Sequence, residues 1–420
     1  MKKKLKGLLS IITSIFIISG GFNSSTINKK DALIEASYSA PSKSSPEPTT
    51  LNSYEQEINQ ANAETTSNIT TTNPVIEVTS PATESKSIII NPTPNLVVTC
   101  SDCNFDISTD LMDKINYTIN NFNKNDISFQ VYDLETNATI NYNLDEKFNG
   151  ACIVKPSIVL YLLKLAEVGK IDLNQVIPYP GNLVGGSGYL NGYYNGYQAY
   201  TGQKITVFEY MYFCLYYSDN NSYRILWKLL IDSGYFENYQ EYMKEIDAES
   251  LCVSKDSMWV RGATAEAGVN IMKEIFSFSQ SSILKYNVDF KQLDGHNLAT
   301  IPKENNFPGD NTFNKELTFG EIIYWIMADG KYDYIEAETG NFSVTKTGFV
   351  SGNGSISCRN LISISYGERT YIICLLTKFN DENARKAVVN DLLSELNQVI
   401  IEFDNYLKLE NKNGLVKKFN

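Results

Sequence analysis

The alternation of apolar and polar residues predicts a helix and two strands at the start of the folded region. Apolar residues recur at helical spacing over positions 111–122, which indicates an amphipathic helix. Runs with the composition of strands follow at 128–134 and 139–144, and a turn-prone segment joins them. We therefore expect one helix followed by two connected strands.

The carboxy-terminal part of the chain returns to the same patterns. Strand-like runs lie at 342–346, 355–365 and 370–377, and apolar positions over 389–403 form one face of a long helix. The intervening residues, as far as 326, are mostly helical in pattern. Strands at both ends with a helical insert between them predict an α+β fold. One antiparallel sheet would be built from both chain ends and covered by the terminal helices, with a helical lobe beside it.

The amino-terminal segments have the composition of an export signal and a linker. Lysines crowd the first six residues and precede an apolar run at 8–18, so residues 1–22 are expected to be a signal peptide or a membrane anchor. Residues 23–95 are rich in Ser, Thr, Asn and Pro and predict a disordered linker. We expect the folded domain at 96–410, a tail at 411–420, and an extracytoplasmic protein that is secreted or held at the cell surface or wall.

The net charge and the histidine count exclude some classes of function. The net charge is −12 and the sequence pI is about 4.8, which argues against nucleic-acid binding because no basic surface would neutralise phosphates. His296 is the single histidine, which excludes a multi-histidine metal site. We expect no metal and no cofactor, and we expect any acyl-transfer chemistry to use a lysine as its base.

The seven cysteines do not form an obvious disulfide framework. An odd count in an exported chain leaves at least one thiol free or paired between molecules. Cys214 and Cys374 lie in apolar runs and are predicted to be small core residues. Cys100 and Cys103 have the spacing of a redox pair, although a local disulfide or two unreactive thiols is the simpler interpretation.

A glycine- and tyrosine-rich segment at 185–197 admits two interpretations. Its tyrosines could stack on a sugar or a peptide at the rim of a cleft. It could equally be a flexible surface loop without a binding role.

Cys152-Ile-Val-Lys155 is the first motif that indicates chemistry. It lies at the start of a long apolar helix, and the three-residue spacing places the thiol and the amine on one helix face. The start of a helix and a neighbouring ammonium group both favour a thiolate. A helix start with an unreactive buried cysteine is the alternative.

Two further motifs follow in order along the chain. Ser218-Asp219-Asn220 ends an aromatic segment, and its hydroxyl and amide groups could relay a proton or hold a substrate amide. Lys346-Thr347-Gly348 closes a strand-like run. A cation beside a hydroxyl suits a substrate carboxylate, and the glycine lets a substrate lie close to the strand edge. Each motif is common when taken alone.

Together, and in this order, the three motifs resemble those of the penicillin-recognising serine hydrolases, which include the class A β-lactamases and the penicillin-binding proteins. The resemblance covers about residues 96–407. It implies the class A β-lactamase fold, with the site between the sheet and the helical lobe. Cysteine stands at 152 where the family keeps its serine.

The resemblance also implies roles for the motif residues. Cys152 takes the position of the nucleophile and Lys155 that of its base. Ser218 and Asn220 take the proton-relay and anchoring roles. The implied substrate-binding residues are Lys346, Thr347, Gly348 and Phe349, with an oxyanion hole made by the backbone N–H groups of residues 152 and 349.

One further departure concerns the group that activates water. The family's β-lactamases carry a Glu-x-x-Leu-Asn loop after the Ser-Asp-Asn motif. The corresponding stretch here, 242–265, contains Glu245 and Glu249 without that pattern. A thioester at Cys152 reacts comparatively well with amines, so acyl transfer is favoured over hydrolysis.

We therefore expect a monomeric acyltransferase or slow acyl hydrolase that acts through Cys152. Its small-molecule partner would be a β-lactam or a D-alanyl peptide of the peptidoglycan stem. Two alternatives are a non-catalytic domain that binds or senses these ligands, and a true class A β-lactamase whose deacylating group the sequence does not reveal.

Overall fold

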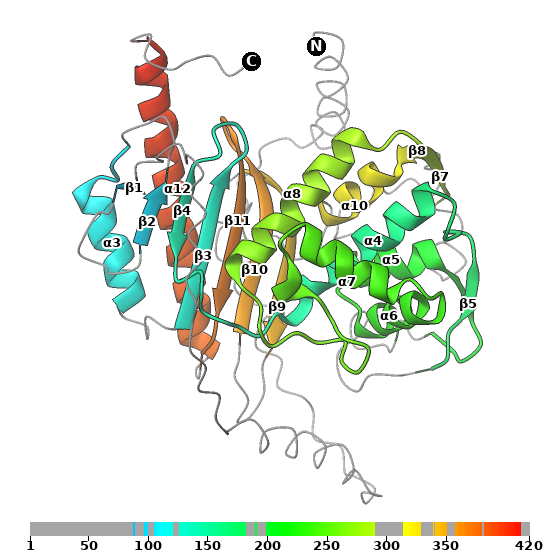
Figure 1. The fold of residues 1–420 in the computed structure, drawn as a ribbon. Coiled ribbons are helices and arrows are strands. Elements are labelled where there is room, and N and C mark those ends of the chain that lie inside the picture. The colour runs from blue at the N-terminus through cyan, green and yellow to red at the C-terminus, as the bar shows by residue number, and fades with distance from the viewer. Residues whose placement is uncertain are drawn as a thin grey trace, which may run out of the picture. The chain divides into compact units, whose positions relative to one another are not determined.

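A seven-stranded antiparallel sheet joins the two ends of the described chain (Figure 1). The computed structural model describes residues 87–88, 96–99, 105–120, 126–181, 190, 199–289, 314–328, 339, 341–350, 358–379 and 382–412. The chain divides into two units, Met1–Thr83 and Glu84–Asn420, and all described residues lie in the second.

The sheet has the strand order β1-β2-β4-β3-β11-β10-β9. Its strands are β1 (Ser87–Ile88), β2 (Leu96–Thr99), β3 (Ile127–Asp133), β4 (Thr139–Tyr142), β9 (Phe342–Val350), β10 (Cys358–Tyr366) and β11 (Thr370–Thr377). The pairing of β3 with β11 brings the two chain ends together, with Phe129 opposite Leu375. This arrangement confirms the predicted sheet, and β1 lies within the stretch that was expected to be a linker.

Two terminal helices cover one face of the sheet. They are α3 (Thr109–Asn120) and α12 (Glu382–Lys412). Alternate strand residues such as Leu361 and Ile373 point to this face, where they join Ile115 and Leu396 in a buried apolar cluster. Both helices were predicted from their apolar spacing.

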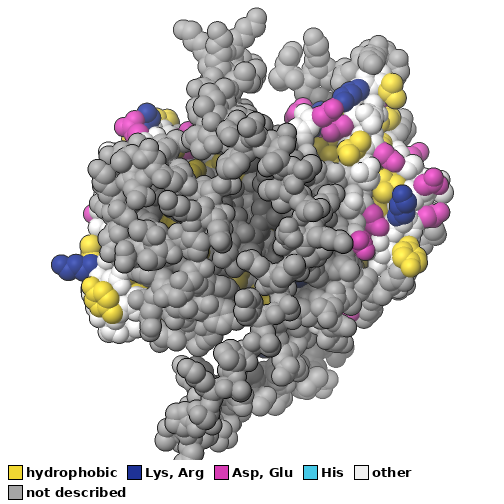
Figure 2. Space-filling view, turned by 180° about the vertical axis from the view of Figure 1, so that it is seen from behind, with side chains coloured by type: hydrophobic (Ala, Val, Ile, Leu, Met, Phe, Trp, Pro, Cys, Tyr) yellow, Lys and Arg dark blue, Asp and Glu magenta, His cyan; other side chains and the backbone are white. Residues whose placement is uncertain are grey.

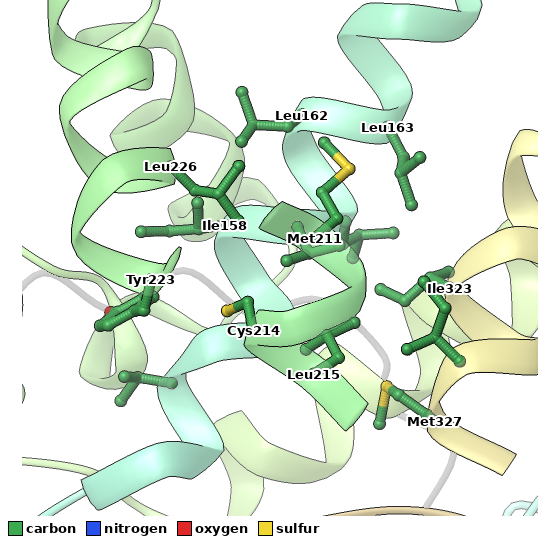
Figure 3. Packing of buried hydrophobic residues seen from close by; sticks show 14 of the residues in the cluster. Ile158, Leu162, Leu163, Met211, Cys214, Leu215, Tyr223, Leu226, Ile323 and Met327 are labelled. Atoms are coloured by element: carbon green, nitrogen blue, oxygen red, sulfur yellow. The ribbon is translucent and has the colours of Figure 1, made fainter. Parts of the chain in front are cut away.

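The opposite face carries the helical lobe. Its helices are α4 (Lys155–Glu167), α5 (Val207–Tyr216), α6 (Asn220–Asp232), α7 (Phe236–Glu245), α8 (Ala265–Ser281) and α10 (Phe319–Ala328). Every residue of α5 is buried, so this helix forms the centre of the lobe. Figure 3 shows Met211 of α5 among Ile158, Leu226 and Ile323 from the surrounding helices.

Two hairpins in the lobe were not predicted. They are β5 (Val176–Pro178) with β6 (Lys204–Thr206), and β7 (Lys285–Asp289) with β8 (Asn314–Thr318). Their strands have three to five residues and no strict alternation, so the periodicity of the sequence does not reveal them.

The predicted core cysteines are buried free thiols. Cys374 packs so closely on α8 that a Cβ added to Gly268 would lie 2.5 Å from its Sγ. The amino-terminal signal or anchor, Cys100, Cys103, His296 and all of the glycine- and tyrosine-rich segment except Leu190 lie outside the described residues. No helix in the described part of the chain is long and apolar enough to cross a membrane.

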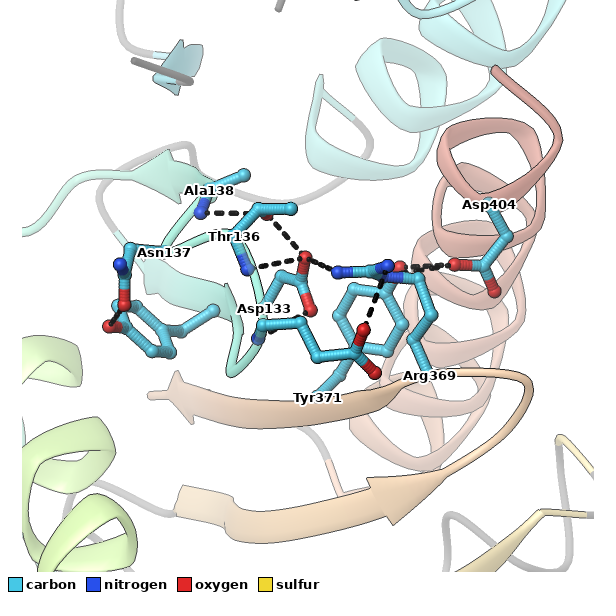
Figure 4. Close-up of polar contacts among 9 residues, drawn as sticks. Asp133, Thr136, Asn137, Ala138, Arg369, Tyr371 and Asp404 are labelled. Carbon is cyan, nitrogen blue, oxygen red and sulfur yellow. Dashed lines mark hydrogen bonds and ion pairs between the residues drawn. The ribbon is translucent and has the colours of Figure 1, made fainter. Parts of the chain in front are cut away.

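A polar network ties strand β3 to helix α12 through β11 (Figure 4). Arg369 forms an ion pair with Asp133 at 2.6 Å, while Tyr371 donates a hydrogen bond to Asp404 at 2.6 Å. Burial raises the pKa of the Asp404 carboxyl. The network joins segments from both ends of the chain and therefore supports the sheet far from the motif residues.

On the face shown in Figure 2, Asp and Glu side chains lie among hydrophobic and basic side chains along one edge.

Candidate active site

Cys152 lies in a short 3₁₀ turn, η3 (Ala151–Val154), and α4 begins only at Lys155. The prediction that both residues belong to the start of one α-helix is therefore wrong in detail. Because residues three apart eclipse each other in a 3₁₀ helix, the thiol and the amine still meet. Ala151 adopts a positive φ of 47°, an uncommon conformation for a residue with a side chain.

Strand β9 packs directly against this turn at Gly348. A Cβ at position 348 would lie 3.0 Å from the backbone nitrogen of Cys152 and 3.1 Å from that of Ile153. Both neighbours are backbone atoms and cannot rotate away. The glycine of the Lys-Thr-Gly motif is thus required for the sheet to approach the 3₁₀ turn that carries Cys152.

Ser218 links the two motif lysines. Lys155 Nζ donates hydrogen bonds to the Ser218 carbonyl, to Ser218 Oγ at 3.2 Å and to Asn220 Oδ1 at 2.8 Å. Lys346 Nζ donates to Ser218 Oγ at 2.9 Å and to the Thr347 carbonyl at 2.9 Å. Ser218 has a positive φ of 55°, so its backbone is held in an uncommon conformation where the two cations converge.

The electrostatics of this cluster favour a thiolate. Burial raises the pKa of the Cys152 thiol, but the Lys155 and Lys346 ammonium groups lower it by more, together with hydrogen bonds to Ser218 and Lys155, so that it reaches about 7. Burial lowers the pKa of Lys346 to about 8, against the opposing attraction of Cys152. The site therefore holds a titrating thiol beside two buried amines.

Asp219 has a structural role within the second motif. It is fully buried and caps helix α6, where its Oδ1 accepts a hydrogen bond from the Ser222 amide at 2.6 Å. Its Oδ2 accepts from the Leu190 amide at 3.0 Å. Asp219 thus ties the buried Leu190, the described residue of the glycine- and tyrosine-rich segment, to the motif.

Strand β9 is an edge strand of the described sheet. Arg359 lies opposite Phe349, and both of its backbone polar groups bond to the Thr377 hydroxyl of β11, at 3.0 and 2.7 Å. The amide of Phe349 therefore points away from β10, on the outer side of β9. Thr347 and Phe349 share a sheet face with Arg359, a cation that sequence reasoning missed.

The two glutamates of the stretch 242–265 that were considered for water activation do not share the burial of the motif lysines. Glu245 and Glu249 are exposed, and Glu249 pairs with Lys244 at 3.7 Å. The stretch 242–265 contributes Trp259 near the cluster instead. Trp259 packs on Tyr223, whose ring lies 5.7 Å from Lys155 Nζ. Among the described residues, no cluster of three His, Cys, Asp or Glu side chains could hold a metal.

Two further polar residues were missed because they belong to none of the three motifs. Asn360 is buried in β10 and bonds to the chain that leads into the nucleophile turn. Tyr223 is buried in α6 and donates to the Met258 carbonyl at 2.8 Å. A polar residue within a buried strand was the one available signal for Asn360.

Comparisons with known proteins agree with this arrangement. Residues 110–294 match the model of the β-lactamase enzyme family. The structure resembles a β-lactamase from Chitinophaga pinensis at 15% identity and TM-score 0.52, covering 70% of this chain and all of the other. It also resembles PBP-A at 13% identity and TM-score 0.51, covering 70% of this chain and 97% of that protein.

A β-lactamase from Sphaerobacter thermophilus is similar at 13% identity and TM-score 0.50, over 70% of this chain and 98% of its own. A variant of PBP-A with comparable similarity, 13% identity and TM-score 0.50 over 70% of this chain and 97% of its own, was solved as an acyl-enzyme complex with penicillin G. The comparison with curated proteins found no match. The described chain thus has the class A β-lactamase fold, and its residues 110–294 match the model of the β-lactamase enzyme family.

Proposed function

We propose that the protein is an acyltransferase or slow acyl hydrolase that forms a thioester at Cys152 with a β-lactam or a D-alanyl peptide. The observation that carries the proposal is the convergence of Lys155 and Lys346 on Ser218 beside a thiol whose pKa is lowered to about 7. A thiol that served only as core packing would be expected to have a raised pKa, as the buried thiol of Cys214 has.

In the first step, the Cys152 thiolate attacks the carbonyl carbon of the substrate amide. A carbon–sulfur bond forms, the carbon–nitrogen bond breaks, and the leaving nitrogen takes a proton from the Ser218 hydroxyl. Lys155 or Lys346 returns a proton to Ser218 and is left as a neutral amine. The Ser218 contacts of 3.2 and 2.9 Å with the two lysines support this relay.

In the second step, an amine attacks the thioester carbon. A carbon–nitrogen bond forms, the carbon–sulfur bond breaks, and the neutral lysine takes the proton of the attacking amine through Ser218. The thiolate and the ammonium group are then restored. Water can replace the amine, but the exposure of Glu245 and Glu249 supports a slow hydrolytic step.

Substrate recognition would use the edge of β9. Lys346 and Thr347 would hold a substrate carboxylate, with Arg359 adding a cation on the sheet face of Thr347. The Phe349 amide points to the strand edge, and none of the hydrogen bonds among the described residues uses the Cys152 amide. These two donors would form the oxyanion hole. The PBP-A variant bound to penicillin G supports a β-lactam as ligand.

The site would work outside the cytoplasm. The lysine-rich start and the apolar run at 8–18 support export or anchoring, and the polar composition of 23–95 supports a linker that carries the domain.

A donor and acceptor assay tests the proposal. The full chain is incubated with a D-alanyl peptide, with and without glycinamide, and the products are identified by mass. The amide of the peptide with glycinamide, formed by the wild type and not by Cys152→Ala, is the expected result. Binding of the peptide that persists in Cys152→Ala without product would instead favour a non-catalytic sensor. Rapid hydrolysis of a cephalosporin would favour a true β-lactamase.

A further inference from the structure

Asn360 holds the chain segment that leads into the nucleophile turn. It is 1% exposed in β10 and lies opposite Gly348 in the sheet register. Its Nδ2 donates hydrogen bonds to the carbonyls of Asn149 at 2.6 Å and Gly150 at 3.4 Å. Its Oδ1 accepts from the Thr377 amide at 3.0 Å, which fixes the orientation of the side-chain amide.

The held segment has an unusual backbone. Ala151 has a φ of 47°, and its amide bonds to the Asn149 side chain at 2.9 Å. Such a conformation persists only where the surroundings determine it. Asn360 donates to the carbonyls of Asn149 and Gly150 on one side of the turn, and Gly348 of β9 lies so near the other side that a Cβ on it would meet the amide nitrogens of Cys152 and Ile153.

The turn carries an amide that no described hydrogen bond uses, that of Cys152. Its position relative to the Phe349 amide decides whether one oxygen atom can accept from both. Asn360 lies on β10, which pairs with the strand β9 that carries Phe349. The side chain of Asn360 therefore holds the turn at a fixed position relative to the second donor.

We infer that Asn360 is a positioning residue that sets the geometry of the oxyanion hole. This inference rests on the proposed acylation of Cys152. Asn360 does not touch the thiol, and its amide acts through the backbone of Asn149 and Gly150. It should therefore affect reactions that develop charge on a carbonyl oxygen and leave the intrinsic reactivity of the thiolate nearly unchanged.

The test compares two reactions of Cys152 in the full chain. Acylation by a fluorescent penicillin develops an oxyanion, whereas alkylation by iodoacetamide attacks a saturated carbon and develops none. Both rates are measured at a pH at which the Cys152 thiol is fully ionised, and modification of the Cys152 peptide is followed by mass. Asn360→Leu should lower the acylation rate about 100-fold and the alkylation rate less than about threefold.

Two additional variants keep the test sharp. Asn360→Asp retains the acceptor for Thr377 and loses the donor, so it should reproduce the split if Asn360→Leu does not fold. Thr377→Val removes the buried hydroxyl contacts to Arg359 at the same point of the sheet, and should leave both rates within about threefold. Wild-type acylation in both Asn360 variants, or equal loss of both reactions, would overturn the inference.

Hydrogen exchange separates this inference from the proposed function. If the wild type is not acylated, the proposed function fails, but the positioning claim is still testable. The hydrogen-bonded amides of Ala151 and Ile153 should exchange at least tenfold faster in Asn360→Leu than in the wild type or Thr377→Val. Unchanged exchange at these amides would show that Asn360 does not hold the turn.

Discussion

Gly348 faces the backbone nitrogen of Cys152 so closely that a Cβ at position 348 would lie 3.0 Å from it. The contact joins the edge strand of the sheet to the turn that carries the thiol. It gives the glycine of the third motif a physical role, because any side chain there would push the nucleophile turn away from β9.

Gly348→Ala should therefore impair acylation. The added methyl group meets backbone atoms, so the turn or the strand must shift by several tenths of an ångström. We expect the rate of acylation by a fluorescent penicillin to fall about 10- to 100-fold, since oxyanion-hole geometry is sensitive to such shifts. Gly262→Ala is the matched control, because its Cβ would meet only the end of Lys147 at 3.8 Å. Equal rates in the two variants would contradict this role.

The thiol should titrate near neutral pH. The rate of Cys152 alkylation by iodoacetamide should rise with pH and reach half its plateau at about pH 7, because the pKa of the thiol is lowered to about 7. Lys155→Met removes the largest attractive contribution to that shift and should move the midpoint to higher pH. A midpoint that is the same in both proteins would show that Lys155 does not ionise the thiol.

The same shift predicts a pH dependence of stability. The folded thiol has a pKa of about 7 against an ordinary value of 9.0, so between these values the unfolded chain binds more protons. The contribution of Cys152 to the free energy of unfolding is fully present above pH 9 and is lost as the pH falls through 7. It should change by at most about 1.4 kcal/mol per pH unit.

The measurement is the difference in unfolding free energy between the wild type and Cys152→Ala, taken from urea titrations at several pH values. The difference is needed because burial raises the pKa of Cys374 and Cys214 and so opposes the trend. This difference should increase as the pH rises from 7 to 9. A difference that decreases over this range would contradict the predicted sign.

Asp219 should matter more for stability than for chemistry. Asp219→Ala leaves the amides of Ser222 and Leu190 without their acceptor and removes the cap of α6. We expect a loss of about 2–4 kcal/mol in the free energy of unfolding by urea. Asp219→Asn keeps an acceptor oxygen and should cost less. If both variants have the same free energy of unfolding as the wild type, Asp219 does not have this structural role.

The sequence predicted the sheet and the terminal helices because their apolar positions repeat with clear periods over long segments. The three-residue spacing predicted that Cys152 and Lys155 lie together, and the resemblance of the three motifs to those of the penicillin-recognising serine hydrolases implied that Ser218 lies beside them. The 3₁₀ turn at Cys152 was not predictable, since its conformation is supported by contacts with residues about 200 positions later in the chain.

Asn360 illustrates the same limit. Its function depends on the register that places β10 beside β9 and the nucleophile turn, and single-sequence patterns do not reveal such long-range pairing. The short hairpins were missed because a strand of three to five residues has too few positions to define a period.

Covalent capture of a β-lactam by Cys152 tests the account most directly. The full chain is incubated with penicillin and with a chromogenic cephalosporin, beside Cys152→Ala and Cys152→Ser, and the intact mass is recorded over time. We predict a persistent adduct with the wild type, none with Cys152→Ala, and acylation of Cys152→Ser, because Lys155 and Lys346 remain in place. No adduct on the folded wild type, or an adduct that persists in Cys152→Ala, would contradict a thiol acyl-enzyme.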